Sequence, residues 1–179
     1  DLYAPQTTLD AEGRRILSAW VRMPKVTDEG WIGMFCTPRV VEVRDGHIFF
    51  PMHPNVRAAY SQEIPAGSQR AKDGYLVSLD LEDGEELDVG GFVIRREGDR
   101  ICTDRSAVFP SFPGAHLRSE TPALKGGCHL DVVVDKDLVE VFVNEGECVI
   151  SNAVYGLEDK IGCSGEGKKM RMHIFSAQR

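Results

Sequence analysis

Acid–base catalysis in this chain would depend on carboxylate side chains, so we first ask which Asp or Glu residues could serve. Two candidates are Asp45, which lies between an Arg and a Gly, and Glu147, which precedes a Cys. Asp-Gly is typical of a two-residue hairpin turn, because both central positions of that turn need positive φ. Glu147 stands two positions after Glu145 next to a tight turn, a spacing that indicates a solvent-exposed strand face. We therefore expect no catalytic residue in this chain.

Cysteine and histidine could hold a metal ion, but their spacing argues against it. No Cys-x-x-Cys, His-x-His or His-Glu-x-x-His pattern occurs. The cysteines are odd in number and scattered, which disfavours both a disulfide scaffold and a zinc site. We expect free thiols, no metal and no cofactor. The residues concerned are Cys36, Cys102, Cys128, Cys148, Cys163, His47, His53, His116, His129 and His173.

Composition restricts the class of partner and the compartment. The 21 basic and 28 acidic residues give a net charge of −7. An acidic chain without a Lys/Arg run is a poor partner for phosphate backbones, which argues against nucleic-acid binding. No apolar run approaches the ~20 residues that span a bilayer, so no membrane partner is expected. Together with free thiols, these features favour a cytoplasmic location.

The elements that must position these residues are almost all β-strands. Residues 3–9 and 14–23 are expected to form a hairpin around a polar loop that ends in a Gly. A second hairpin should flank the Asp45-Gly46 turn, and residues 54–60 could make one or two helical turns. No other segment has a sustained helical period.

The second half of the chain has the clearest strand patterns. Residues 75–82 alternate, with Tyr75 on the apolar side and Ser78 on the polar side, which predicts a strand with one wet face. Residues 130–150 contain three β-branched runs separated by turns, typical of a meander. A last strand is expected at residues 169–175. The pattern predicts an all-β fold, an antiparallel β-sandwich.

Four stretches, in order, resemble glycoside hydrolase family 32, which contains invertases, levanases and sucrose-6-phosphate hydrolases. Tyr-Ala-Pro-Gln at residues 3–6 and a strand ending in Trp20 resemble the last blade of that family's five-bladed propeller. Residues 31–39 resemble the segment that leads from propeller to sandwich. Residues 103–106, Thr-Asp-Arg-Ser, and residues 130–151 resemble two parts of the sandwich itself.

This resemblance implies a β-propeller followed by a β-sandwich of the jelly-roll or concanavalin-like type. Residues 1–37 are then the last propeller hairpin and linker, and residues 38–179 are the sandwich. The family hydrolyses terminal β-fructofuranosyl bonds with retention, a reaction that needs two carboxyl groups. Its motifs Trp-Met-Asn-Asp-Pro-Asn-Gly, Arg-Asp-Pro and Glu-Cys-Pro are incomplete or missing here. The chain alone is therefore expected to be inactive, with the catalytic propeller as its partner and sucrose, sucrose-6-phosphate or another fructosyl substrate bound through that domain.

The resemblance also implies roles for single residues. Tyr3 and Trp20 match aromatic residues that help line the family's fructose pocket, where aromatic rings can stack on the C–H face of a sugar. Core packing is the alternative for Trp20. Trp31, Pro38 and Arg39 are expected at the interface between the propeller hairpin and the sandwich, with Trp31 as the apolar anchor.

Two functions of other classes stay open. A stand-alone lectin-like sandwich could bind fructans, but it would need an exposed aromatic platform, and both Trp residues precede residue 32. The chain could also be an interaction element. A two-stranded hairpin taken from a four-stranded blade has unpaired edges, which predicts either a homodimer or a fraying hairpin.

Overall fold

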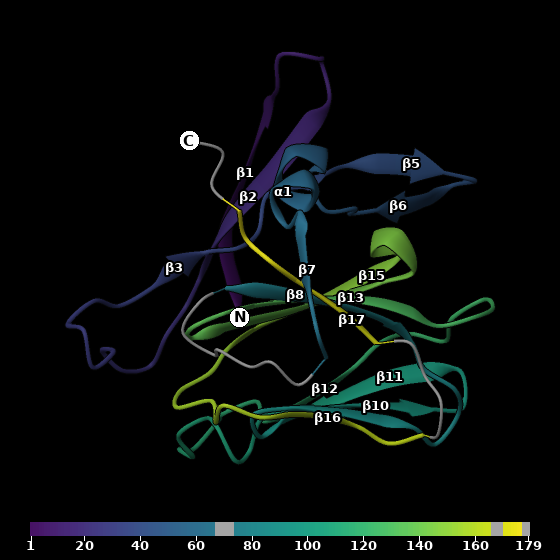
Figure 1. Ribbon diagram of the computed structural model, residues 1–179. Helices are drawn as coiled ribbons and strands as arrows, with labels where there is room; N and C mark the ends of the chain where they lie inside the picture. Colours follow the sequence, from purple (N-terminus) through teal and green to yellow (C-terminus); the bar gives the residue numbers. More distant parts are fainter. Residues whose placement is uncertain (67–73, 166–169, 177–179) are drawn as a thin grey trace.

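The computed structural model describes residues 1–66, 74–165 and 170–176, and the regular structure of these residues is almost entirely antiparallel β-sheet (Figure 1). The helices are α1 (Pro54–Ala59) and the single 3-10 turn η1 (Asn144–Gly146). The strands are β1 (Leu2–Leu9), β2 (Arg15–Val21), β3 (Met34–Phe35), β4 (Arg39–Val40), β5 (Glu42–Arg44), β6 (His47–Phe49), β7 (Gln62–Ile64), β8 (Tyr75–Asp80), β9 (Glu86–Val89), β10 (Phe92–Glu97), β11 (Arg100–Asp104), β12 (Arg118–Glu120), β13 (His129–Asp135), β14 (Leu138–Val143), β15 (Cys148–Ala153), β16 (Ile161–Cys163) and β17 (Arg171–Ile174).

Two sheets face each other and confirm the predicted β-sandwich. One has the order β12-β11-β10-β9-β16 and the other the order β15-β14-β13-β8-β17-β7. Their inner faces share one apolar core, which includes the fully buried Leu87, Phe92, Val132, Val141 and Met172. Burying each such side chain contributes about 1.5–3 kcal/mol, so this core supplies most of the driving force for folding.

The six-stranded sheet is covered on both faces, and the predicted wet face of residues 75–82 is therefore wrong for most of β8. Ser78 is buried, and its hydroxyl bonds the Asp131 carboxylate. A second cluster of Tyr60, Leu76, Val133 and Phe142 fills this outer face. Figure 1 shows the cause: α1 and the β1–β2 hairpin lie on the side of this sheet opposite the five-stranded sheet.

A separate sheet contains the first strands of the chain. β2 pairs with β1, β3 and β4, which confirms the predicted first hairpin. The register of β1 against β2 shifts between Tyr3 and Gln6, where Ala4 has a φ of 47°. β4 brings Arg39 and Val40 into the same sheet. The predicted domain boundary after residue 37 stays a prediction.

The turn of the first hairpin is held by one aspartate. Asp10 Oδ2 accepts hydrogen bonds from Arg14 Nε at 2.6 Å and from His53 Nε2 at 3.2 Å, and Oδ1 accepts the Arg14 backbone N–H at 2.8 Å. His53 in turn caps α1, because its Nδ1 accepts the Asn55 N–H. Partial desolvation acts to raise the pKa of Asp10, but the hydrogen bonds from Arg14 and then from His53 hold that pKa well below its ordinary value.

We expect this aspartate to make folding stability sensitive to acid. The unfolded carboxyl has a pKa of 3.8, whereas the folded one stays ionised to lower pH. Below about pH 4 the unfolded state therefore binds more protons, and stability falls as the pH falls. Urea unfolding between pH 7 and pH 3 measures how the free energy of unfolding depends on pH. We expect this free energy to fall less steeply towards acid pH in Asp10→Asn than in the parent. Asp45→Asn, in the other hairpin turn, is the control and should keep the parent slope; an unchanged slope in Asp10→Asn would contradict the assignment.

Candidate functional site

Tyr3 and Trp20, the two predicted sugar-binding residues, meet on one face of the first sheet. They are directly opposite each other in the β1–β2 register, so their side chains project on the same side. The ring centroids are 6.0 Å apart with an interplanar angle of 72°, an edge-to-face pair. Tyr3 is 55% exposed and Trp20 is 40% exposed, so both rings are accessible. The alternative of core packing does not describe Trp20 in this chain.

A third aromatic side chain on this face was not anticipated. Phe35 of β3 is the register partner of Trp20 and is 76% exposed. The guanidinium of Arg22 lies over the Tyr3 ring, 5.4 Å from its centroid. We call Tyr3, Trp20 and Phe35 the aromatic face. An exposed apolar surface of aromatic rings with a cation beside it can bind the C–H face of a sugar and hydrogen-bond its rim.

A buried ion pair connects β4 to the six-stranded sheet of the sandwich. Arg39 Nη2 donates to Glu140 Oε1 at 2.5 Å and to Ser151 Oγ at 2.8 Å. Glu140 is 0% exposed, and its other oxygen accepts the Thr37 backbone N–H at 2.6 Å. Pro38 is exposed and contributes its carbonyl, which accepts the His53 N–H. Of the predicted interface residues Pro38 and Arg39, Arg39 is therefore the one whose side chain contacts the six-stranded sheet.

Trp31 packs at the same junction through apolar contacts. It is half-buried against a cluster that joins β2 to the sandwich through Phe109, Leu138 and Ala153. Its indole N–H donates to Glu29 Oε2 at 3.1 Å, and Glu29 also pairs with Lys136 at 2.8 Å. Trp31 thus packs against residues of both parts of the chain, and its role as their anchor stays a prediction.

A second buried arginine, which the sequence did not reveal, holds the start of β1. Arg105 is 2% exposed, and its guanidinium binds both carboxylate oxygens of Asp1. It also donates to the carbonyls of Ala153 and His116, both at 2.9 Å, and lies 3.7 Å from the centroid of the Phe109 ring. Burial lowers the pKa of Arg105 to about 10, so the side chain is still charged at neutral pH.

The carboxylates considered at the outset occupy structural positions. Asp45 has a φ of 48° in the β5–β6 turn, as predicted. Glu145 pairs with Arg44 at 3.0 Å, and Glu147 accepts a hydrogen bond from the Asn144 side chain at 2.8 Å. Each carboxylate is thus accounted for by turn geometry or by a local partner.

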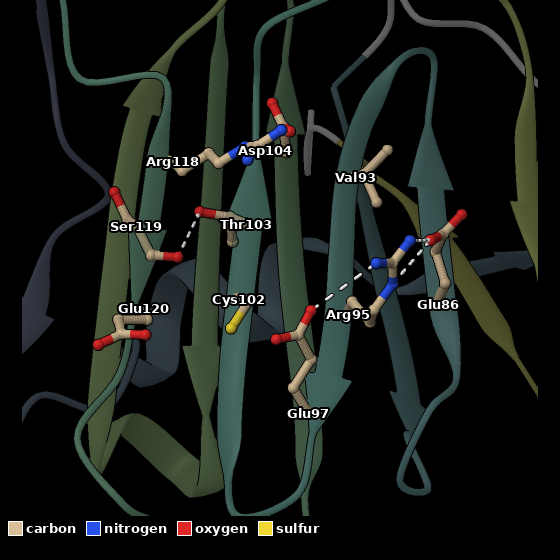
Figure 2. Close-up of a pocket in the computed structure, with 10 residues that line it drawn as sticks. All are labelled: Glu86, Val93, Arg95, Glu97, Cys102, Thr103, Asp104, Arg118, Ser119 and Glu120. Atoms are coloured by element: carbon tan, nitrogen blue, oxygen red, sulfur yellow. Dashed lines mark hydrogen bonds and ion pairs between the residues drawn. The ribbon is translucent and has the colours of Figure 1, made fainter.

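The five-stranded sheet has a shallow groove of about 610 Å³ on its outer face (Figure 2). Its charged side chains pair with one another: Arg95 with Glu86 and Glu97, and Arg118 with Asp104. No aromatic side chain is among the residues that line it. Because these ion pairs already occupy the polar groups and no ring offers a stacking surface, the groove does not provide the platform that a lectin-like sandwich would need.

The described ranges contain no group of three or more His, Cys, Asp or Glu side chains placed to hold a metal ion. None of the helices within those ranges has the length and apolarity that crossing a membrane demands. Cys36, Cys102 and Cys148 are free thiols, and burial raises the pKa of each.

A sheet with an exposed aromatic face is joined by buried charges to a β-sandwich, so this chain is a β-protein with two structural parts. The profile described as "Glycosyl hydrolases family 32 C terminal" matches residues 76–177, and that described as "Glycosyl hydrolases family 32 N-terminal domain" matches residues 1–54. The chain belongs to glycosyl hydrolase family 32. The first sheet is accordingly the end of the family's N-terminal domain.

Several relatives are similar over nearly the whole chain. A sucrose-6-phosphate hydrolase of Vibrio alginolyticus is 28% identical over 87% of this chain and 35% of its own length. A raffinose invertase of Escherichia coli is 31% identical over 89% of this chain and 38% of its own length. The structure of sucrose-6-phosphate hydrolase from Lactobacillus gasseri superimposes with a TM-score of 0.80 at 20% identity, over 99% of this chain and 42% of that one. The chain thus spans roughly a third of the length of these curated relatives and has the fold of their carboxyl-terminal part.

Proposed function

We propose that this chain is the carboxyl-terminal part of a β-fructofuranosidase that hydrolyses terminal β-fructofuranosyl bonds, in sucrose or sucrose-6-phosphate, with retention of configuration. The observation that carries the proposal is the meeting of Tyr3 and Trp20 on an exposed sheet face at the end of the N-terminal domain. The activities for which the relatives are named, sucrose-6-phosphate hydrolase and raffinose invertase, favour this substrate class.

In the complete enzyme the catalytic carboxylates belong to the propeller that precedes Asp1. Retaining hydrolysis needs a nucleophile and an acid/base about 5–5.5 Å apart. The chain contains no Asp-Pro and no Glu-Cys-Pro, the sequences in which the family carries such groups. The role of this part is to complete the sugar pocket with Tyr3 and Trp20 and to brace the propeller through Arg39 and Arg105.

The test compares two proteins. Purified 179-residue chain should release no glucose from sucrose, whereas the product of the gene read upstream of Asp1, if it carries Trp-Met-Asn-Asp-Pro-Asn-Gly, should release it. Replacing the Asp of that motif by Asn should abolish the activity. Hydrolysis by the 179-residue chain, or an upstream region without a propeller, would overturn the proposal. Binding of inulin or levan by the short chain in calorimetry would favour the lectin-like alternative instead.

We also propose a cytoplasmic location, supported by the free thiols of Cys36, Cys102 and Cys148. A homodimer is the partner expected of the short chain, because β1 is an edge strand with all its residues exposed. A monomeric mass in light scattering would contradict the dimer.

A further inference from the structure

Gly33 lies against the indole of Trp20 in a way that leaves no room for a side chain. A Cβ atom placed on Gly33 would come 1.9 Å from Trp20 Nε1, 2.6 Å from Cε2 and 2.9 Å from Cζ2. All three atoms belong to the ring system, so the ring itself occupies the volume that any other residue at position 33 would fill. No comparable contact exists at Gly30, three residues earlier, where a Cβ would meet nothing within 4 Å.

The backbone at this position also requires glycine. Gly33 has a φ of +82°, in the left-handed region that residues with a Cβ rarely adopt. It stands one residue before β3, which pairs with β2 so that Phe35 is opposite Trp20. The conformation of Gly33 therefore leads the chain into β3 and sets that strand beside the Trp20 ring.

Two neighbours define the position of the indole. One is Gly33, and the other is Tyr3, whose ring meets it edge to face. Within the part of the chain that the structure describes, no side chain or carbonyl accepts a hydrogen bond from the Trp20 indole N–H, whereas the Trp31 N–H has Glu29. Ring packing, rather than a hydrogen bond, is thus what orients Trp20.

We propose that Gly33 is a positioning residue of the sugar pocket: the absence of its side chain sets the depth and tilt at which the Trp20 indole presents its open face to the fructosyl unit. The inference rests on the proposed function, because it acts through the binding role of Trp20. Gly33 itself touches no sugar. A displaced ring would still be aromatic and exposed, but it would no longer match the ring plane of the bound sugar.

The test uses the enzyme that includes the upstream propeller, with sucrose as substrate. Gly33→Ala is expected to raise KM about tenfold and to leave kcat within about twofold of the parent value. This pattern is expected because the contacts that are lost stabilise the bound substrate and the transition state equally. Gly30→Ala is the matched control: its φ of +89° imposes the same backbone strain, and its Cβ has open space. It should leave KM within about twofold of the parent value.

A double variant separates positioning from general damage. With Trp20→Ala the obstructing ring is gone, so adding Gly33→Ala should change KM no more than Gly30→Ala does. Equal effects of Gly33→Ala in both backgrounds would overturn the inference alone. If Trp20→Ala leaves KM unchanged, the binding role of Trp20 fails, and the inference fails with it.

A spectroscopic readout tests the ring position without catalysis. In the 179-residue chain carrying Trp31→Phe, Trp20 is the single tryptophan. Gly33→Ala should shift its emission and increase its quenching by acrylamide, and Gly30→Ala should do neither. Identical spectra for the two variants would show that residue 33 does not control the indole, whatever the enzyme's substrate.

Discussion

Replacing Arg39 by Ala is expected to lower the free energy of unfolding by roughly 3–5 kcal/mol, the usual cost of removing one partner of a buried ion pair. The carboxylate of Glu140 has no solvent exposure, and within the described residues Arg39 is the only cation that pairs with it. Ser151 and the Thr37 N–H would stay, but neither neutralises the charge. The uncompensated carboxylate, rather than the lost hydrogen bond, causes the effect.

Urea unfolding measures this change, and two variants control it. Arg118→Ala removes an arginine that pairs with Asp104 at 2.8 Å but is 81% exposed, and it should change stability little, because exposed pairs contribute little. The double variant Arg39→Ala/Glu140→Ala leaves no unpaired charge and should be more stable than the sum of the single effects indicates. Additive effects would contradict a direct interaction between Arg39 and Glu140.

Arg105→Ala is expected to cost roughly 3 kcal/mol, because it removes four hydrogen bonds and leaves two carbonyls and the Asp1 carboxylate without their donor. The substitution should lower the free energy of unfolding of the whole chain and should also loosen the start of β1. β1 is an edge strand that pairs only with β2 in the described sheet, so release of Asp1 should expose the strand to proteases. Urea unfolding gives the free energy, and limited proteolysis gives the local effect.

Arg105→Lys tests the geometry of this contact separately from its charge. A lysine ammonium cannot reproduce the planar arrangement by which the guanidinium contacts Asp1, Ala153 and His116 together, so it should recover only a minor part of the stability. Cleavage within β1 should stay faster than in the parent. A lysine variant as stable and as resistant as the parent would show that charge alone is needed at this position.

The sequence predicts correctly those turns and strands that are specified by residues close to one another in the chain. The Asp45-Gly46 turn has the two positive φ values, 48° and 76°, that its sequence indicates. The meander at residues 130–150 is present as β13, β14 and β15, because β-branched runs and tight turns specify it directly. The last strand is present at Arg171–Ile174, while Lys169, where it was expected to begin, lies outside the described residues.

Elements that depend on distant partners were missed. β12 and β16 have three residues each, and β9 has four; each pairs within the five-stranded sheet with residues that no short-range pattern identifies. The burial of Ser78 depends on the packing of α1 on its sheet, which alternation along one strand does not contain. The alternation of residues along a strand predicts on which side of the sheet each side chain lies. Whether that side is buried depends on what the rest of the fold packs against it.

The same distinction holds at the candidate site. Tyr3 and Trp20 were found through a family resemblance, and the structure brings them into contact; their role in binding sugar stays a prediction. Asp1 and Arg105 are 104 positions apart, and a single buried Asp–Arg pair has no periodic signature in sequence. Gly33 could be recognised only from the ring that occupies its side-chain volume.

The two arginine contacts attach the first sheet to the sandwich at separate places, one beside β4 and one at the start of β1. One attachment would act as a pivot, about which the sheet could turn while the linker stayed intact. Two attachments leave rotation only about the line that joins them, and the Trp31 cluster, a third point of contact, opposes that rotation. In a longer chain the sandwich would therefore move with the first sheet as one body rather than swing about the segment that joins them.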